Sequence, residues 1–171
     1  MKQYGWIWMP LAAISTSVYA TTYFTVDQAQ AAMFPGEKLT SAFVTLTDAQ
    51  ARQIETQTGV NVRLREVKAW KVASGGWFIV DEVVGKHEFI TYAVALSADG
   101  SVKNIEIMDY RESYGYEVRT PAWRKQFVGK TAADPLKLDQ DIHNISGATL
   151  SSKHIADGVK RVLATYVVAL K

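Results

Sequence analysis

The sequence contains no cysteine among its 171 residues. Disulfide bonds, thiolate catalysis, zinc–thiolate sites, iron–sulfur clusters and C-x-x-C-H haem attachment are therefore excluded. A chain of this length can bury a core that is stable by packing alone, without covalent or metal cross-links. Hydrophobic residues make up 48% of the sequence and charged residues 21%. This balance is typical of a globular domain and not of a disordered chain.

An excess of charge of either sign is also missing. The sequence has 19 lysines and arginines and 17 aspartates and glutamates, so the formal net charge is only +2. A near-neutral protein lacks the basic surface that binds nucleic acid or an anionic membrane. We therefore expect no nucleic-acid partner.

No apolar run reaches the roughly 20 residues that a membrane-spanning helix needs. Residues 1–20 instead resemble a secretory signal, because Lys2 precedes a short apolar stretch that is interrupted by Pro10. Val18-Tyr19-Ala20 fits a cleavage site. We predict a signal peptide over residues 1–20 and a single secreted domain over residues 21–171. An uncleaved membrane anchor is the alternative.

The periodicity of the remaining sequence predicts an α+β domain. Glycine turns at Gly75-Gly76 and Asp99-Gly100 separate β-branched and aromatic runs, as in antiparallel hairpins. We therefore expect a single domain with an antiparallel sheet flanked by helices. The predicted strands cover residues 39–46, 61–67, 68–72, 77–84, 89–96 and 102–108, and the predicted helices cover residues 25–33, 49–57 and the stretch from 152 onward.

The C-terminal helix has a clear apolar stripe and an informative start. Its apolar residues recur at helical spacing, while Ser151 and Ser152 can cap its first turn. Thr149 then lies where a loop meets a helix N-terminus, whose free N–H groups and dipole favour phosphate. Taken alone, small polar residues here are equally typical of an ordinary turn and cap. The stripe comprises Ile155, Val159, Val162, Leu163, Tyr166, Val167 and Leu170.

The motif Ser146-Gly147-Ala148-Thr149-Leu150-Ser151 resembles the flavinylation motif of FMN-binding domains. These domains occur in the periplasmic FMN-carrying subunits of the sodium-translocating NADH:quinone reductase and of the Rnf complex, and in smaller secreted relatives. The resemblance implies that Thr149 carries FMN through a phosphoester bond. It also implies a periplasmic location and a separate flavin transferase that makes the bond from FAD. The cofactor-binding residues of the motif are then Ser146, Gly147, Ala148, Thr149, Leu150 and Ser151.

One position departs from the family motif. The family usually has an acidic residue six positions before the threonine, and His143 occupies that position here. The nearest acid is Asp141, which could still reach the transferase from its shifted place.

A second stretch follows the predicted strand over residues 102–108. Glu112-Ser113-Tyr114-Gly115 is similar to the Glu-Thr-Pro-Gly-like loop of the family, and Trp123 and the segment Phe127–Lys130 also match. The resemblance covers residues 89–167, and we place the FMN-binding core at residues 87–168. It implies that Glu112, Tyr114, Gly115 and Trp123 bind the cofactor.

The chemistry of a flavin ring suits these residue types, although each also has an ordinary structural explanation. Aromatic side chains can stack on the planar ring, and glycine permits close backbone approach. Trp123 and Phe127, four residues apart, could equally be core contacts, and Glu112 could be a cap or salt-bridge residue. The acidic pair Asp81-Glu82 is expected to be solvated.

Three functions remain compatible with the sequence. The first is a periplasmic electron-transfer protein with covalent FMN, whose partners are the flavin transferase and membrane or periplasmic redox proteins. The second is a non-redox ligand-binding or interaction module that has lost the flavin. The third is a flavin-dependent reductase, which needs a substrate pocket beside the ring. We expect no catalytic acid–base pair and no metal site, because His87, His143 and His154 lack metal-ligand spacing.

Overall fold

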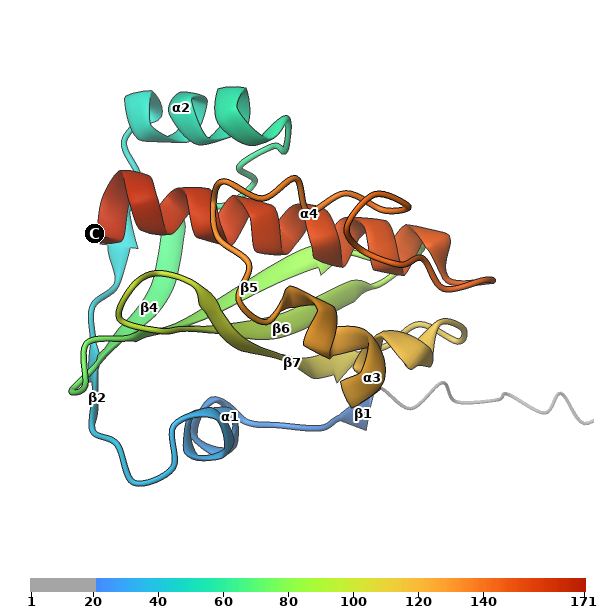
Figure 1. Ribbon diagram of the computed structural model, residues 1–171, viewed down its shortest axis with the longest axis horizontal. Coiled ribbons are helices and arrows are strands. Elements are labelled where there is room, and N and C mark those ends of the chain that lie inside the picture. The colour runs from blue at the N-terminus through green and yellow to red at the C-terminus, as the bar shows by residue number, and fades with distance from the viewer. Residues whose placement is uncertain (1–20) are drawn as a thin grey trace, which may run out of the picture.

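An antiparallel sheet organises the computed structural model, which describes residues 21–171. The strand order is β1-β7-β6-β5-β4-β2, and β3 pairs with β4 beside this path (Figure 1). The predicted signal peptide lies outside the described residues. The strands are β1 (Thr21–Thr22), β2 (Leu39–Ser41), β3 (Val44–Thr45), β4 (Glu66–Val72), β5 (Trp77–Val84), β6 (Phe89–Leu96) and β7 (Val102–Tyr110).

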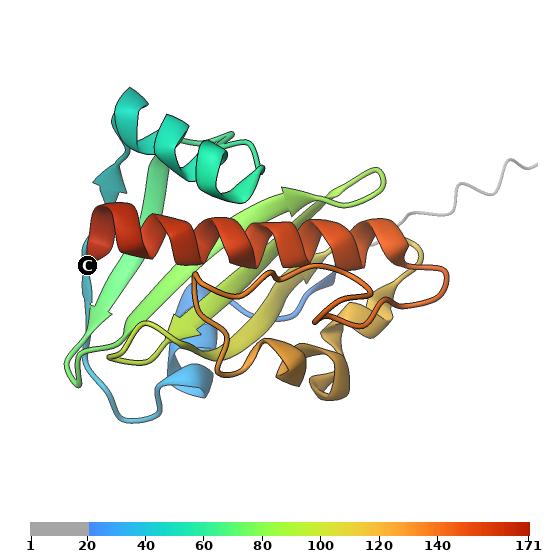
Figure 2. The ribbon, with the colours of Figure 1, turned by 45° about the horizontal axis from the view of Figure 1, so that its top comes forward.

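Helices cover both faces of this sheet, which confirms the predicted α+β class. Figure 2 shows α4 running across one face with α2 outside it, and Figure 1 shows α1 on the opposite face. The helices are α1 (Val26–Met33), α2 (Asp48–Thr58), α3 (Pro121–Arg124) and α4 (Thr149–Thr165), with 3₁₀ turns at Tyr116–Arg119 and Lys125–Phe127 and a π-helical end at Tyr166–Leu170. No helix within residues 21–171 is both long enough and apolar enough to cross a membrane.

The central strand β6 explains how the two faces differ. Its larger side chains, such as Tyr92 and Val94, belong to the core beneath α4. Its alanines, Ala93 and Ala95, belong to the smaller core beneath α1. Because both faces are covered, the strand reads as a continuous apolar run and not as an alternation.

Helix α4 lies close against the sheet at Gly158. A Cβ atom at this position would lie 2.7 Å from Val83 Cγ1 and would also collide with the hydroxyl of Tyr92. Glycine in a helix interior costs roughly 1 kcal/mol relative to alanine. Here it permits the close packing that fixes the position of α4, and therefore of Thr149 at its start.

A partly buried ion pair ties the same helix to β5. Arg161 donates to Asp81 Oδ2 at 2.7 Å, and the hydroxyl of Tyr92 donates to the same oxygen at 2.8 Å. Burial, and then the neighbouring Asp81 carboxylate, raise the pKa of Tyr92. The expectation that Asp81 is solvated was wrong, because its partner Arg161 lies 80 residues later in the chain.

Most predicted elements are confirmed, and two of the predicted strands are corrected. Strands β5 and β6 have the predicted bounds. The strand predicted over residues 39–46 is interrupted at Ala42 and Phe43, where Phe43 packs edge-on against Trp70 at the sheet edge. The strand predicted over residues 61–67 begins only at Glu66. Its first part has no strand neighbour and instead lies along α2, where Val62 donates to Glu55.

The start of α2 offers a simple stability test. The Thr47 hydroxyl accepts from the Gln50 amide, and the Gln50 side chain accepts from the Thr47 amide, which forms a complete capping box. We expect Thr47→Ala to lower the free energy of unfolding by about 1 kcal/mol, because one helix N–H group loses its acceptor. Urea unfolding would measure the change. Thr47→Ser keeps the hydroxyl and should therefore retain most of the wild-type stability. Equal losses of stability in both variants would contradict the capping explanation.

Candidate functional site

A cleft of about 480 Å³ opens beside the first turn of α4. Three segments line it: the turn after β5, the loop after β7, and the start of α4. Its volume lies within the roughly 300–1,000 Å³ of typical ligand pockets. We call it the Thr149 cleft. Its lining residues are Lys86, His87, Glu112, Ser113, Tyr114, Gly147, Thr149, Leu150 and Ser151.

Thr149 is the first residue of α4, and its side chain is exposed. Its hydroxyl oxygen accepts a hydrogen bond from the Asn144 side-chain amide at 3.2 Å. This bond orients the Thr149 oxygen. The sequence analysis did not single out Asn144, because an asparagine five residues before a helix is an ordinary loop residue.

The N-terminus of α4 has no side-chain cap. Residue Ala148 is in the N-cap position and has no polar side chain to offer, whereas α1 and α2 begin with threonine capping boxes. The prediction that Ser151 and Ser152 cap the helix was wrong, because the helix begins two residues earlier and buries both serines. The first-turn N–H groups of α4 therefore face the cleft region without a side-chain acceptor, which suits a phosphate group.

Tyr110, at the end of β7, joins the loop after β7 to the first turn of α4. Its hydroxyl donates to the Tyr114 carbonyl and lies 3.2 Å from Ser151 Oγ. Burial raises the pKa of Tyr110, so it stays protonated and can donate at neutral pH. Ser151 thus lines the cleft, and its hydroxyl also links α4 to the sheet.

Gly115 lies behind the cleft wall and is buried. Its φ angle is +87°, and a Cβ atom there would lie 2.8 Å from Ala148 Cβ and 2.7 Å from the Tyr110 hydroxyl. The close approach that glycine permits is therefore between two protein segments. A contact of Gly115 with the cofactor stays a prediction.

Two other predicted residues lie at the rim of the cleft. Tyr114 is 80% exposed, and Leu150 is 46% exposed. An aromatic and an aliphatic side chain that are both accessible to solvent can cover a planar apolar ligand when one binds. Gly147 also lines the cleft, and nothing lies within 4 Å of a Cβ atom added to it. Ser146 is exposed beside it, and Ala148 is buried against Gly115.

Trp123 lies in the core and does not line the cleft. Its ring packs against Phe127 at a centroid distance of 5.2 Å, and its indole N–H donates to the His143 carbonyl at 2.8 Å. The contact positions the segment that leads to Thr149. Any direct contact between Trp123 and the cofactor stays a prediction.

Glu112 holds the turn after β5 against the loop after β7. Its Oε1 atom accepts from the backbone N–H groups of His87 at 2.6 Å and Glu88 at 3.0 Å. Partial burial alone would raise the pKa of Glu112, but backbone hydrogen bonds from Glu88, His87 and Lys86 and the His87 charge outweigh it. The pKa of Glu112 therefore lies below its ordinary value of 4.5.

This depressed pKa gives the turn a pH dependence. Because the pKa is lower in the folded state, the carboxylate stabilises the turn fully above its ordinary value and loses this effect as pH falls through the folded-state pKa. We expect the His87 and Glu88 amides to lose protection in that acidic range, as measured by hydrogen exchange after correction for intrinsic rates. Glu112→Gln should show weak protection at all pH values, while Glu117→Gln should behave like the wild type. Unchanged protection in Glu112→Gln would contradict the assignment.

Lys86 and His87 are the cleft residues that lie outside both segments singled out by the sequence analysis. They lie in the turn between β5 and β6, which the sequence indicates only as a break. Both can carry positive charge towards a bound anion. No local signal marks them, because only the packing of α4 across the sheet brings this turn to the helix N-terminus.

Asp141, the acid nearest to the motif, is engaged within the protein. Its carboxylate accepts from Lys130 Nζ at 2.9 Å and from the backbone N–H groups of Leu136 and Lys137. Burial would raise the pKa of Asp141, but the Lys137 amide, the Lys130 ammonium group and the Leu136 amide together lower it. Asp141 therefore organises its own loop, while His143 is exposed at the usual acidic position.

Comparison with known proteins finds a family match for the region that contains this cleft. The sequence matches no curated protein at a significant level. Residues 85–164 match the model of the FMN-binding domain, and this range spans the turn after β5, the loop after β7 and most of α4. This match confirms, for residues 85–164, the resemblance to the FMN-binding domain family that the Thr149 motif indicates.

Proposed function

We propose that this protein is an electron-transfer protein that carries FMN through a phosphoester bond to Thr149 and works in the periplasm. One observation carries the proposal: the Thr149 hydroxyl is exposed at the uncapped start of α4 and borders a cleft of about 480 Å³. A phosphate on this oxygen would lie beside the free N–H groups of the helix, where the helix dipole stabilises negative charge.

The residues of the cleft fit the parts of FMN. Lys86 provides positive charge near the anionic cofactor, His87 provides a ring nitrogen for hydrogen bonding, and Tyr114 and Leu150 provide apolar surface for a planar ring. Asn144 orients the Thr149 oxygen, and Glu112 fixes the turn that carries Lys86. Bound FMN supplies the redox chemistry, since flavins connect two-electron and one-electron partners.

Electron transfer places few demands on the surrounding side chains. It requires a cofactor held close to a partner and no nucleophile or proton-transferring residue of the protein. The exposure of Tyr114 and Leu150 leaves one side of the cleft accessible. We propose that a flavin transferase reaches Thr149 from this side during maturation, and that membrane or periplasmic redox proteins approach the same side afterwards.

A second candidate function is a binding module without covalent flavin. It is favoured by His143 at the position where the family motif is usually acidic, and by the engagement of Asp141 with Lys130. If the transferase needs a free carboxylate at that position, Asp141 cannot replace it without breaking this ion pair. Such a module would still bind a ligand in the Thr149 cleft.

The two candidates differ in the mass of the exported protein. The full chain would be produced in cells that contain a flavin transferase and are shown to flavinylate another target. A mass increase of one FMN less one water, together with flavin fluorescence that survives denaturation, would support the carrier. An unmodified protein under these conditions would contradict it and favour the binding module.

A further inference from the structure

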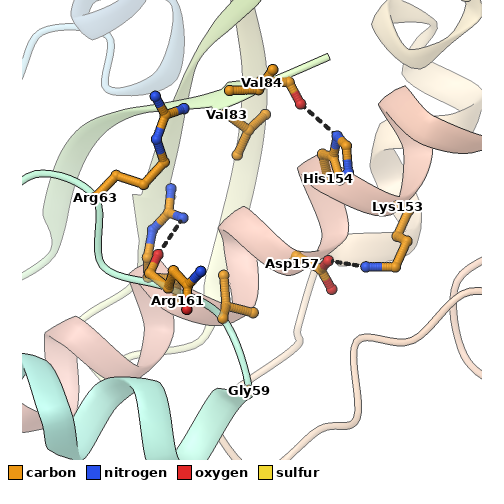
Figure 3. A pocket seen from close by; sticks show the side chains of 10 residues that line it. Gly59, Arg63, Val83, Val84, Lys153, His154, Asp157 and Arg161 are labelled. Carbon is orange, nitrogen blue, oxygen red and sulfur yellow. Dashed lines mark hydrogen bonds and ion pairs between the residues drawn. The ribbon is translucent and has the colours of Figure 1, made fainter. Parts of the chain in front are cut away.

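A second cavity of about 290 Å³ lies farther along α4 than the Thr149 cleft. Figure 3 shows its walls: the loop after α2, the end of β5, and the side chains of α4 that follow one another at helical spacing. We call it the Arg63 cavity. Its lining residues are Gly59, Val60, Asn61, Arg63, Val83, Val84, Lys153, His154, Asp157 and Arg161.

Positive charge exceeds negative charge on the walls of the Arg63 cavity. Three cationic side chains and one carboxylate line it. Lys153 pairs with Asp157 at 2.6 Å, and Arg161 pairs with Asp81 behind the wall at 2.7 Å. Within residues 21–171, Arg63 forms no ion pair, so it is the cation whose charge remains for a ligand.

Arg63 stacks on an aromatic ring and, within the part of the chain that the structure describes, donates no hydrogen bond. Its guanidinium group lies over the Phe89 ring, 5.0 Å from the ring centroid. Stacking on an aromatic face restricts the side chain and leaves the N–H edge of the guanidinium group available. Such an arrangement matches the planar, bidentate geometry of a carboxylate.

The loop that carries Arg63 is anchored to the rest of the protein. Arg161 donates to the Asn61 carbonyl at 3.3 Å and to the Glu82 carbonyl at 3.0 Å, so one side chain joins the loop, β5 and α4. Figure 3 shows the guanidinium groups of Arg63 and Arg161 on the same side of the cavity. The cavity is therefore preformed, which reduces the entropic cost of binding.

The remaining wall of the cavity is apolar. Val60, Val83 and Val84 provide hydrocarbon surface. At the end of the cavity, the His154 Nδ1–H group donates to the Val84 carbonyl and closes the gap between α4 and β5 (Figure 3). Apolar surface beside a single free cation suits an organic anion with a hydrocarbon portion better than a bare inorganic ion.

We propose that the Arg63 cavity binds a small organic carboxylate, whose carboxylate group pairs with Arg63 and whose hydrocarbon portion contacts the three valines. This site is separate from the Thr149 cleft, because the two cavities share no lining residue. Helix α4 contributes to both, and the end of β5 in this cavity leads directly into the turn that lines the Thr149 cleft, so a bound carboxylate would lie next to the proposed flavin site. Binding itself does not require the flavin.

The test uses titrations of the full exported chain, monitored by amide NMR signals. The probes are pentanoate, its neutral analogue pentanamide, and inorganic phosphate. We expect saturable shifts at Gly59, Asn61 and Val84 with pentanoate, and at least tenfold weaker binding of the other two probes. Arg63→Gln should weaken pentanoate binding about tenfold or more, because a charge-assisted hydrogen bond is lost.

Arg65→Gln is the matched control. Arg65 is two residues away, pairs with Asp48 at 3.1 Å and does not line the cavity. Its removal should leave pentanoate binding unchanged. The proposal would be overturned by the absence of saturable shifts, by equal binding of pentanamide, by tighter binding of phosphate, or by equal losses in both arginine variants. Because the titration works on unflavinylated protein, its failure would leave the proposed carrier function untouched.

Discussion

Thr149→Val is expected to remove covalent FMN from the exported protein completely. Valine has nearly the shape of threonine but lacks the hydroxyl oxygen that the phosphoester requires. The wild-type oxygen is exposed and accepts a single hydrogen bond from Asn144, so its loss removes little else. We expect the free energy of unfolding to change by less than about 0.5 kcal/mol, as for most surface substitutions. Intact mass and fluorescence after denaturation measure the attachment, and urea unfolding measures the stability.

Thr40→Val is the matched control for this prediction. Thr40 is an exposed threonine on the edge strand β2 and does not line the Thr149 cleft. The variant should carry the same flavin mass as the wild type. Attachment that persists in Thr149→Val would place the phosphoester on another hydroxyl, while loss of flavin in both variants would indicate a general defect in export or folding.

The strands of the central sheet could be predicted from the sequence because their signals are local. Strands β5 and β6 are β-branched and aromatic runs bounded by glycine or charged turns, and both have the predicted bounds. The capping boxes at Thr25 and Thr47 are also local, since each involves residues three positions apart. Such features depend on neighbours in the chain, which a single sequence displays directly.

The start of α4 could not be placed correctly for the opposite reason. Ser151 and Ser152 have the composition of caps, yet contacts from distant residues place the helix start at Thr149. Tyr110 contacts Ser151 from 41 residues away, and Gly115 packs against Ala148. These contacts favour a buried Ser151, so tertiary packing overrides the local capping preference.

The composition of the cleft was predicted in part. The motif around Thr149 and the loop around Glu112 were both singled out, and the structure brings them together in one cleft. Lys86 and His87 were missed because their turn joins the site only through the antiparallel pairing of β5 with β6 beneath α4. The ion pair of Asp81 was missed for the same reason, since its partner Arg161 follows 80 residues later in the chain.

The second large effect is expected from Gly115→Ala, compared with Gly147→Ala. Both glycines have left-handed backbone, with φ angles of +87° and +83°. Placing alanine in this conformation costs roughly 1–2 kcal/mol at either position. At Gly147, nothing lies within 4 Å of the added Cβ, so this is the whole cost. At Gly115, the Cβ also meets Ala148 and the Tyr110 hydroxyl, and overpacking of this kind adds about 1–3 kcal/mol.

The difference between the two glycine variants therefore measures the contact between Gly115 and Ala148, because the cost of backbone strain is the same in both. We expect urea unfolding to show Gly115→Ala to be less stable than Gly147→Ala by about 1–3 kcal/mol. The flavin content of folded Gly115→Ala should also fall, because the added methyl group pushes Ala148 away from the loop and displaces Thr149. In a double-mutant cycle, Gly115→Ala should cost less stability in the Tyr110→Phe background than in the wild type, since removing the hydroxyl relieves one of the two collisions. Equal stabilities of the two glycine variants would mean that the loops can separate freely, and that Gly115 does not position the start of α4.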